Sequence, residues 1–207
     1  MIQPYNSKYF SPSKEFRRLS LLLLIKGNAH ISQHGLSEES HLSSSMVNIY
    51  IKELSKDGLI RISGTSNRTF EYHLTKTGIS FLDKHFLEFS AETVQLYAAV
   101  KNEFIRILNQ FESTGIRTLV LYGASDTGEI VYAAIQHTRM AVLGVIDSDP
   151  VKHGKLFRDK IIQPPHCISE IAPDAVLITS FARQNEMHEQ IKKHLSSEIQ
   201  ILKLVNL

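Results

Sequence analysis

The chain has little of what marks secreted, membrane or disulfide-bonded proteins. A single cysteine, Cys167, excludes an internal disulfide, and a reducing cytoplasm is the simplest home for such a chain. The densest apolar run, residues 19–25, is far shorter than the roughly 20 residues that a membrane span needs. Polar residues come first at the N-terminus and no small-residue cleavage site follows, so we expect no secretory signal. We therefore predict a cytoplasmic protein with no membrane partner.

Signs of metal binding and of catalysis are also scarce. The histidines and Cys167 share no short spacing of the kind that zinc ligands show, and the adjacent His166 and Cys167 follow two prolines in what reads as a loop. No serine, histidine and acid arrangement is visible. Cys167 fits a buried, inert thiol better than a redox-sensitive one. We predict a protein without a metal site that is not an enzyme.

What is present is an ordinary globular composition with an uneven charge distribution. The 207 residues, 43% hydrophobic and 21% charged, allow one large domain or two small ones. Residues 1–90 carry 11 Lys and Arg against 8 Asp and Glu, whereas residues 91–207 carry 12 against 13. The basic excess therefore lies in the N-terminal part. It fits a nucleic-acid partner and equally a solvated basic face, so the positions of the residues must decide.

The N-terminal part follows a pattern of three helices. Ser13 can cap a helix that ends at Gly27, and a short helix fits residues 35–40. Residues 43–45 are three serines, which offer an N-cap for a third helix that ends at Gly58. In the third helix one face is apolar and the other is polar, so we expect the polar face to be left for a partner.

A β-hairpin is predicted after the third helix. Residues 59–63 and 68–74 alternate with a period of two on either side of a GTSN turn. Three helices and a hairpin make a winged helix, whose third helix enters the major groove and whose hairpin lies along the DNA backbone. The run SSSMVNIYIKELSKDGLIRI, with LTKTG after the hairpin, resembles winged-helix transcription regulators of the MarR type over about residues 13–85.

Seven residues are candidates for contact with double-stranded DNA. We expect Ser44, Ser45, Asn48 and Lys52 to face the groove and Arg61, Arg68 and Lys76 to meet phosphates. Asn48 is suited to a bidentate contact with adenine, whereas Ile49 stands where relatives of the MarR type often carry a basic residue. The alternative is a winged helix used for protein contact. Because one winged helix reads only a half-site, we also expect a homodimer.

Two further helices are predicted before the C-terminal part, over residues 77–86 and, after a capping-type Ser90, as far as Phe111. A seam of apolar residues follows the second of these, made of Tyr97, Val100, Phe104, Ile107 and Phe111. The seam either pairs with another copy or docks on the C-terminal domain. We place a winged-helix domain at residues 1–89, a linking and dimerisation helix at 90–115 and a ligand-binding domain at 116–207.

The C-terminal part alternates strands and helices. Residues 118–147 read as a strand, a glycine turn, a helix and a second strand, and both strands are apolar almost throughout. Such strands are typical of a parallel sheet covered on both faces. Further strands are expected at residues 160–163, 174–180 and 199–205, with helical segments at 168–171 and 186–195. The fold class is therefore α/β, with a small Rossmann-like parallel sheet of about five strands and no tight hairpin.

The glycine turn carries part of a dinucleotide-binding fingerprint. Gly123 and Gly128 match its first and third glycines, but Ser125 adds a side chain at the place of closest approach. Asp147 stands 19 residues beyond Gly128, near the spacing of a residue that binds ribose hydroxyls, although its DSDP sequence is also an ordinary turn. Ligand binding and a vestigial pocket both remain open. The candidate ligand-binding residues are Gly123, Ala124, Ser125, Asp126, Thr127, Gly128, Asp147 and Lys152.

Two further resemblances concern the ligand. The order of winged helix and Rossmann-like sheet is similar to the repressors that sense the ratio of NADH to NAD. The segments YGASDTGEI and VIDSDPVKHGK resemble the C-terminal domains of sugar C-methyltransferases and related nucleotide-sugar enzymes, over residues 116–205. These resemblances imply a nucleotide, nucleotide-sugar, sugar-phosphate or NAD ligand. We interpret the chain as a ligand-responsive transcription regulator; the alternative is an enzyme or accessory protein of nucleotide-sugar or polysaccharide metabolism.

Overall fold

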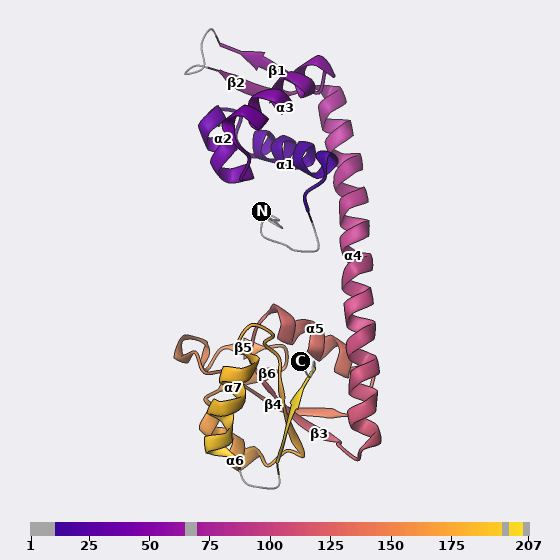
Figure 1. The fold of residues 1–207 in the computed structure, drawn as a ribbon, viewed down its shortest axis with the longest axis vertical. Helices are drawn as coiled ribbons and strands as arrows, with labels where there is room; N and C mark the ends of the chain where they lie inside the picture. The colour runs from indigo at the N-terminus through magenta and orange to yellow at the C-terminus, as the bar shows by residue number, and fades with distance from the viewer. Residues whose placement is uncertain (1–10, 65–69, 196–198, 205–207) are drawn as a thin grey trace. The chain divides into compact units, whose positions relative to one another are not determined.

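A computed structural model describes residues 11–64, 70–195 and 199–204 (Figure 1). The chain divides into two compact units, Met1–Val94 (unit 1) and Gln95–Leu207 (unit 2). Helix α4 (Lys76–Ser113) contributes its first half to unit 1 and its second half to unit 2. Within the described ranges, no helix is both long and apolar enough to cross a membrane.

Unit 1 begins with three helices, each opened by a serine. They are α1 (Lys14–Gly27), α2 (Gln33–Ser40) and α3 (Ser44–Lys56). The hydroxyl oxygens of Ser13, Ser32 and Ser43 each accept a hydrogen bond from the backbone N–H three residues on, which satisfies a group that the helix leaves free. The predicted caps at Ser13 and within residues 43–45 are confirmed.

A short antiparallel hairpin completes the winged-helix arrangement. Strand β1 (Ile60–Ser63) pairs with β2 (Glu71–Leu74), and the buried Tyr72 of β2 packs in the same core as the inward faces of the three helices. The predicted order of helix, helix, helix and hairpin is therefore confirmed. Residues 65–69, at the tip of the predicted turn, lie outside the described part of the chain.

The LTKTG segment joins the hairpin to α4 through a close backbone contact. The Thr75 hydroxyl donates to the Gly58 carbonyl at 2.6 Å, and accepts from the Gly78 N–H at 2.9 Å. A Cβ atom on Gly78 would stand 1.9 Å from the Leu59 carbonyl oxygen. Glycine is therefore required at position 78 for α4 to begin where it does.

Helix α4 corrects the prediction of two separate helices. It is continuous from Lys76 to Ser113, and Ser90 does not begin a new helix. Instead, the Ser90 hydroxyl donates to the Phe86 carbonyl at 2.7 Å, one turn back. Serine makes either contact, a cap or a bond to the preceding turn, and the sequence alone does not choose between them. No glycine or proline lies between residues 79 and 113, so the helix continues through Ser90.

Unit 2 contains a six-stranded, mostly parallel sheet with helices between its strands. Its strands are β3 (Thr118–Tyr122), β4 (Ala141–Ile146), β5 (Leu156–Phe157), β6 (Lys160–Gln163), β7 (Ala175–Ile178) and β8 (Gln200–Lys203). Its helices are α5 (Asp126–Ile135), α6 (Ile168–Ile171), α7 (Gln184–Ile191) and the 3-10 turns η1 (Pro150–Lys152), η2 (Pro165–Cys167) and η3 (Lys192–His194). The strand order is β5-β6-β4-β3-β7-β8, and only β5 runs antiparallel to its neighbour.

The sheet differs from the prediction at one edge. It has six strands rather than about five, because the two-residue β5 folds back on β6 in a tight hairpin. Arg158, which has a positive φ of 56°, lies in this turn. A two-residue strand is too short for alternation to reveal it, and arginine is not a residue that signals a left-handed turn. The remaining predicted strands, near residues 160–163, 174–180 and 199–205, are confirmed.

Helices cover both faces of the sheet, as predicted from its apolar strands. On one face α5 and the second half of α4 pack against Leu119 and Leu121 of β3. On the other face α6 and α7 pack against Val120 and Tyr122. Of the predicted apolar seam on α4, Phe104 is buried in this core and Ile107 and Phe111 pack against it, whereas Tyr97 and Val100 are exposed.

The strand order places a reversal beside β3. From β3 the chain proceeds outward to β4 and β6, and then returns to the opposite side of β3 to form β7 and β8. In open α/β sheets the connections diverge at such a reversal, which leaves a crevice beyond the carboxyl ends of the two strands. Two of the predicted ligand residues, Gly123 and Asp147, follow β3 and β4 at that edge.

Candidate functional site

The outer face of α3 carries the predicted groove-facing residues. Ser44, Asn48 and Lys52 are four residues apart and therefore lie in one row along the helix, and Ser45 is beside them. All four side chains are exposed. The opposite face of α3 is buried in the core of unit 1, through Val47, Tyr50, Ile51 and Leu54. Burial of the apolar face thus fixes which side of α3 remains available to a partner.

Cations from α1 pair with the acidic residues of α3 and of its C-cap. The Lys14 ammonium is 2.9 Å from the Glu53 carboxylate, and the Arg18 guanidinium is 2.7 Å from Asp57. These pairs offset the negative charge at the C-terminal end of α3. Lys52, on the exposed row, makes no hydrogen bond or ion pair with any other described residue. The outer face is therefore polar and carries a positive charge.

The predicted phosphate-contacting residues belong to other elements. Arg61 lies on β1 and Lys76 is the first residue of α4, and both are exposed. Arg68 lies outside the described residues. Ile49, beside Asn48 on α3, is 51% exposed. Its apolar side chain does not suit contact with phosphate.

In unit 2 the loop after β3 is closed tightly on itself. Gly123 has a φ of 118°, and a Cβ atom there would stand 2.9 Å from the Thr179 hydroxyl oxygen. The Thr179 hydroxyl, which is fully buried, lies within hydrogen-bonding distance of the carbonyls of Tyr122 and Gly123. A Cβ atom on Gly128 would stand 2.6 Å from the Gly123 carbonyl oxygen. Both predicted glycines are therefore required by close approach of the backbone, whatever the loop binds.

Asp147, at the end of β4, holds this loop in place. Its carboxylate accepts hydrogen bonds from the Ala124 N–H at 2.8 Å and the Asp149 N–H at 2.9 Å, and the Lys152 ammonium is 2.9 Å away. Burial alone would raise the pKa of Asp147, but the Asp149 amide, Lys152 and the Ala124 amide together lower it. Asp147 is 6% exposed. In this arrangement the protein's own groups, rather than a ribose, occupy the carboxylate.

A crevice opens beside Asp147 at the carboxyl ends of β3, β4 and β7. Its volume is about 70 Å³, and its lining residues are Gly123, Ser125, Asp147, Ser148, Lys152, Ser180, Arg183 and Met187. Its two cations are partly neutralised, Lys152 by Asp147 and Arg183 by a two-point contact with Glu186 at 2.7 and 2.8 Å. Hydroxyl groups and cations side by side suit an anionic, oxygen-rich ligand.

A second, larger hollow adjoins the crevice through a shared residue. Ser148 lines both, and the larger hollow, of about 260 Å³, is also lined by Tyr122, Pro165, Gln190, Lys193 and His194. The Tyr122 hydroxyl donates to the Gln190 side-chain oxygen at 3.0 Å. Burial of Tyr122 raises its pKa, so the hydroxyl stays protonated and keeps this hydrogen bond to Gln190. Together the two hollows have room for more than a single phosphate group.

The structure brings half of the predicted ligand residues into the crevice. Gly123, Ser125, Asp147 and Lys152 line it, whereas Asp126, Thr127 and Gly128 do not, and Ala124 contributes only its backbone. Sequence reasoning missed Ser148, Ser180 and Arg183. Ser180 follows the apolar strand β7, so the rule that ligands bind beyond the carboxyl ends of strands would have found it. Arg183 comes from the start of α7, and nothing in its local sequence points to the crevice.

Metal binding finds no support among the residues that the structure describes. None of them form a group of three or more histidine, cysteine, aspartate or glutamate side chains suited to hold an ion. Cys167, in η2, is partly buried.

Comparison with known families supports a DNA-binding class for unit 1. Residues 17–61 match the family described as winged helix-turn-helix DNA-binding. The three helices and the hairpin of unit 1 agree with this match. Residues 115–202 match a second family, described as C2185-like, N-terminal. Each match covers less than half of the chain. The comparison with curated proteins finds no match.

Similar solved structures include regulators and an enzyme. A probable transcriptional regulator from Pseudomonas aeruginosa is 17% identical, with a TM-score of 0.37, over 45% of this chain and 68% of that one. A MarR family protein from Mycobacterium tuberculosis, in complex with salicylic acid, is 17% identical, with a TM-score of 0.36, over 46% and 75%. UDP-D-quinovosamine 4-dehydrogenase from Vibrio fischeri is 20% identical, with a TM-score of 0.37, over 45% and 81%.

Proposed function

We propose that this protein is a ligand-responsive transcription regulator, in which the winged helix reads double-stranded DNA and the sheet of unit 2 senses a small molecule. The observation that carries the proposal is the exposed row of Ser44, Asn48 and Lys52 on the third helix of a winged helix-turn-helix. In this class of fold that helix enters the major groove. Under this proposal the protein has no catalytic activity.

We propose a separate role for each of three consecutive segments of the chain. Residues 1–89 form the DNA reader, residues 90–115 form a linking and dimerisation helix, and residues 116–207 form a Rossmann-like ligand domain. Asn48 reads a base edge, while Lys52, Arg61, Arg68 and Lys76 hold phosphates. A homodimer places two readers on the two half-sites of an operator. The exposed Tyr97 and Val100 on α4 are the proposed contacts between the two copies.

The DNA proposal is tested by the salt dependence of binding. Each phosphate contact releases condensed counterions, so replacing Lys52 and Arg61 with Ala lowers the slope of log affinity against log salt by about two. The measurement is fluorescence anisotropy of a labelled duplex between low and moderate ionic strength.

A matched control removes two positive charges elsewhere. Lys84→Ala with Lys192→Ala makes the same change in net charge at exposed sites outside the proposed reader face, and we expect the slope to stay near that of the wild type. If both double variants lower the slope equally, the binding depends on net charge alone. If the wild type shows no salt-dependent retention of DNA at low ionic strength, the proposal fails.

The proposed effector is a nucleotide, a nucleotide sugar or a sugar phosphate. The crevice supports this class because Lys152 and Arg183 stand beside Ser125, Ser148 and Ser180, which pair cations with hydroxyl groups. Its ligand has to compete with Asp147 for Lys152 and with Glu186 for Arg183. A thermal-shift screen with NAD, UDP-sugars and sugar phosphates identifies the compound. Arg183→Ala then lowers its affinity, and an unchanged affinity removes the crevice as the site.

A second candidate function is protein contact by the winged helix, in an accessory protein of nucleotide-sugar or polysaccharide metabolism. Ile49 favours it, since a half-exposed isoleucine on the outer face of α3 suits an apolar partner surface. In the groove it would meet only a thymine methyl group. Ile49→Ser separates the two: DNA affinity changes little under the first proposal, whereas a protein partner would be lost under the second.

A further inference from the structure

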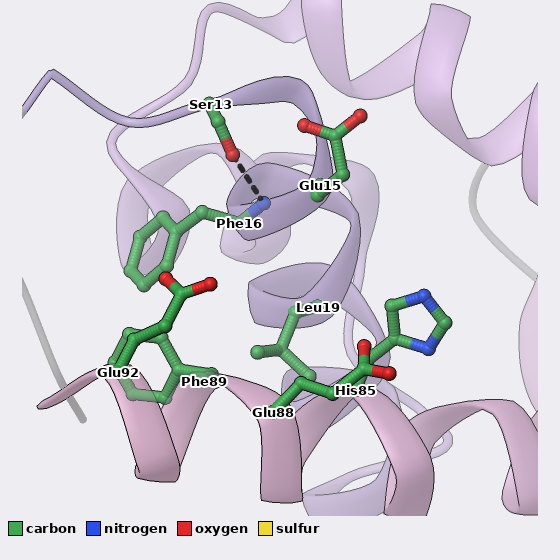
Figure 2. A pocket seen from close by; sticks show the side chains of 8 residues that line it. All are labelled: Ser13, Glu15, Phe16, Leu19, His85, Glu88, Phe89 and Glu92. Carbon is green, nitrogen blue, oxygen red and sulfur yellow. Dashed lines mark hydrogen bonds between the residues drawn. The ribbon is translucent and has the colours of Figure 1, made fainter. Parts of the chain in front are cut away.

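A cavity that neither proposed site uses lies in unit 1, between the beginning of α1 and residues 85–92 of α4 (Figure 2). Its volume is about 300 Å³, the largest of the three hollows considered so far. All of its lining residues fall within unit 1. The cavity is therefore a property of one compact unit.

The apolar part of the cavity is aromatic. The rings of Phe16, from α1, and Phe89, from α4, lie with their centroids 5.5 Å apart and tilted by 48°. Leu19, which is 4% exposed and belongs to the core of unit 1, also lines the cavity (Figure 2). The face of an aromatic ring carries negative potential, so a cavity of this kind attracts cations as well as apolar groups.

The polar part of the cavity is acidic. Glu15, Glu88 and Glu92 line it, and their side chains come from both helices (Figure 2). A hydrogen bond from its own backbone amide and one with the Ser13 hydroxyl lower the pKa of Glu15, which keeps that carboxylate charged at neutral pH. Of the cations near the cavity, Lys14 is paired with Glu53 and Arg18 with Asp57. Lys14 and Arg18 also act on the Glu15 carboxylate, although more weakly than its own hydrogen bonds, and the Lys84 ammonium is 3.8 Å from Glu88. No ion pair among the described residues reaches Glu92.

The imidazole of His85 also lines the cavity. His85 donates from Nδ1 to the Phe81 carbonyl at 2.9 Å and stacks on the Phe81 ring with centroids 3.7 Å apart. In the neutral ring Nε2 is then an acceptor, and it too favours a ligand that donates or carries positive charge. Three carboxylates, two aromatic rings and this imidazole thus point to the same ligand chemistry.

We propose that this cavity binds a small organic cation with an apolar body, such as an aromatic or quaternary ammonium compound. The cationic group lies against the Phe16 and Phe89 rings and among the carboxylates, while the apolar body fills the space toward Leu19. An organic anion of the same size is repelled by the carboxylates. The site is independent of the proposed effector crevice in unit 2.

The test uses the full chain and three probes of similar size. Benzyltrimethylammonium carries the positive charge, benzyl alcohol is neutral and salicylate is negative. Isothermal titration calorimetry is expected to show saturable binding of the cation, weaker binding of the alcohol and none of salicylate. In the variant Glu88→Gln with Glu92→Gln the affinity for the cation falls about tenfold, because two nearby charges are lost while the shape is kept.

A matched variant separates this site from general electrostatics. Glu39→Gln with Glu170→Gln removes two exposed carboxylates from α2 and α6, and we expect it to bind the cation as the wild type does. Phe89→Leu tests the aromatic part, with the thermal transition of the chain as the control for folding. Salicylate binding as tight as that of the cation, or an equal loss in both double variants, overturns the proposal. An affinity of the Glu88 and Glu92 variant within twofold of wild type also overturns it.

Discussion

The outer face of α3 and the crevice of unit 2 differ in how many of their polar side chains already form hydrogen bonds and ion pairs within the protein. The side chains of Asn48 and Lys52 are exposed and make no hydrogen bond or ion pair with another described residue. In the crevice, by contrast, Asp147 holds Lys152 and two backbone amides, and Glu186 holds Arg183. A polyanion can therefore dock on α3 without breaking any of these bonds. The ligand proposed for the crevice has to compete with the protein's own ion pairs, so we expect that site to be selective.

The largest effect that we predict concerns the close packing of Gly78, at the beginning of α4, against the Leu59 carbonyl. Gly78→Ala places a Cβ atom 1.9 Å from the Leu59 carbonyl oxygen, and backbone must move to relieve it. We expect a loss of about 3 kcal/mol or more in the stability of unit 1, at the upper end of overpacking effects. Gly27→Ala is the control, since nothing lies within 4 Å of its added Cβ. Denaturant unfolding measures both, and equal midpoints would contradict the packing.

The next prediction concerns the contribution of the Asp147 hydrogen bonds and ion pair to the stability of unit 2. Asp147→Ala leaves two amides and Lys152 without their acceptor, and we expect a cost of about 1–3 kcal/mol in unit 2. Asp126→Asn, at an exposed aspartate that begins α5, is the control and is expected to cost less than about 1 kcal/mol. Similar losses in both would mean that the network contributes nothing of its own.

The pH dependence of the same network has a definite sign. The pKa of Asp147 is lowered on folding, so its contribution to stability is complete above the unfolded value near 3.8. The contribution is lost as the pH falls from there through the lower folded pKa. The difference in unfolding free energy between wild type and Asp147→Ala should therefore shrink on acidification below about pH 4. A constant difference across that range would show that Asp147 acts only through its shape.

Local patterns predicted the elements of both regions, because local chemistry determines them. Serines before α1 and α3 cap helices wherever the following residues can be helical, and the apolar run of β3 has to be covered on both faces. The continuity of α4 could not be predicted, since Ser90 suits a cap and a helix interior equally well. Arg183 could not be predicted for a different reason: it reaches the crevice only because the chain returns beside β3, and no local pattern encodes that return.

A further prediction concerns recognition of the DNA sequence by α3. If Asn48 makes a bidentate contact with adenine, Asn48→Ala costs about 1–3 kcal/mol on the preferred duplex and much less on random DNA. Asn109→Ala, at an exposed position of α4 in unit 2, is the control. Competition assays with preferred and random duplexes measure the ratio. An equal loss on both would assign Asn48 to general affinity rather than to sequence preference.

The smallest effect tests the continuity of α4. Because the Ser90 hydroxyl bonds to the preceding turn, Ser90→Ala should change stability by less than about 0.5 kcal/mol. Ser43→Ala removes a cap that accepts from the Met46 N–H, and should cost about 1 kcal/mol. A cost at Ser90 equal to that at Ser43 would mean that a helix begins there after all.

The most direct test of a regulator that joins a DNA reader to a ligand sensor is the affinity for DNA with and without the crevice ligand. Thermodynamic linkage requires that the ligand and the DNA change each other's affinity by the same factor, and a coupling of about 1–3 kcal/mol gives a change of roughly 5- to 150-fold. We predict a change within that range, and its loss in Arg183→Ala at a ligand concentration that saturates the wild type. Equal DNA affinities for the free and the ligand-saturated protein would contradict the account.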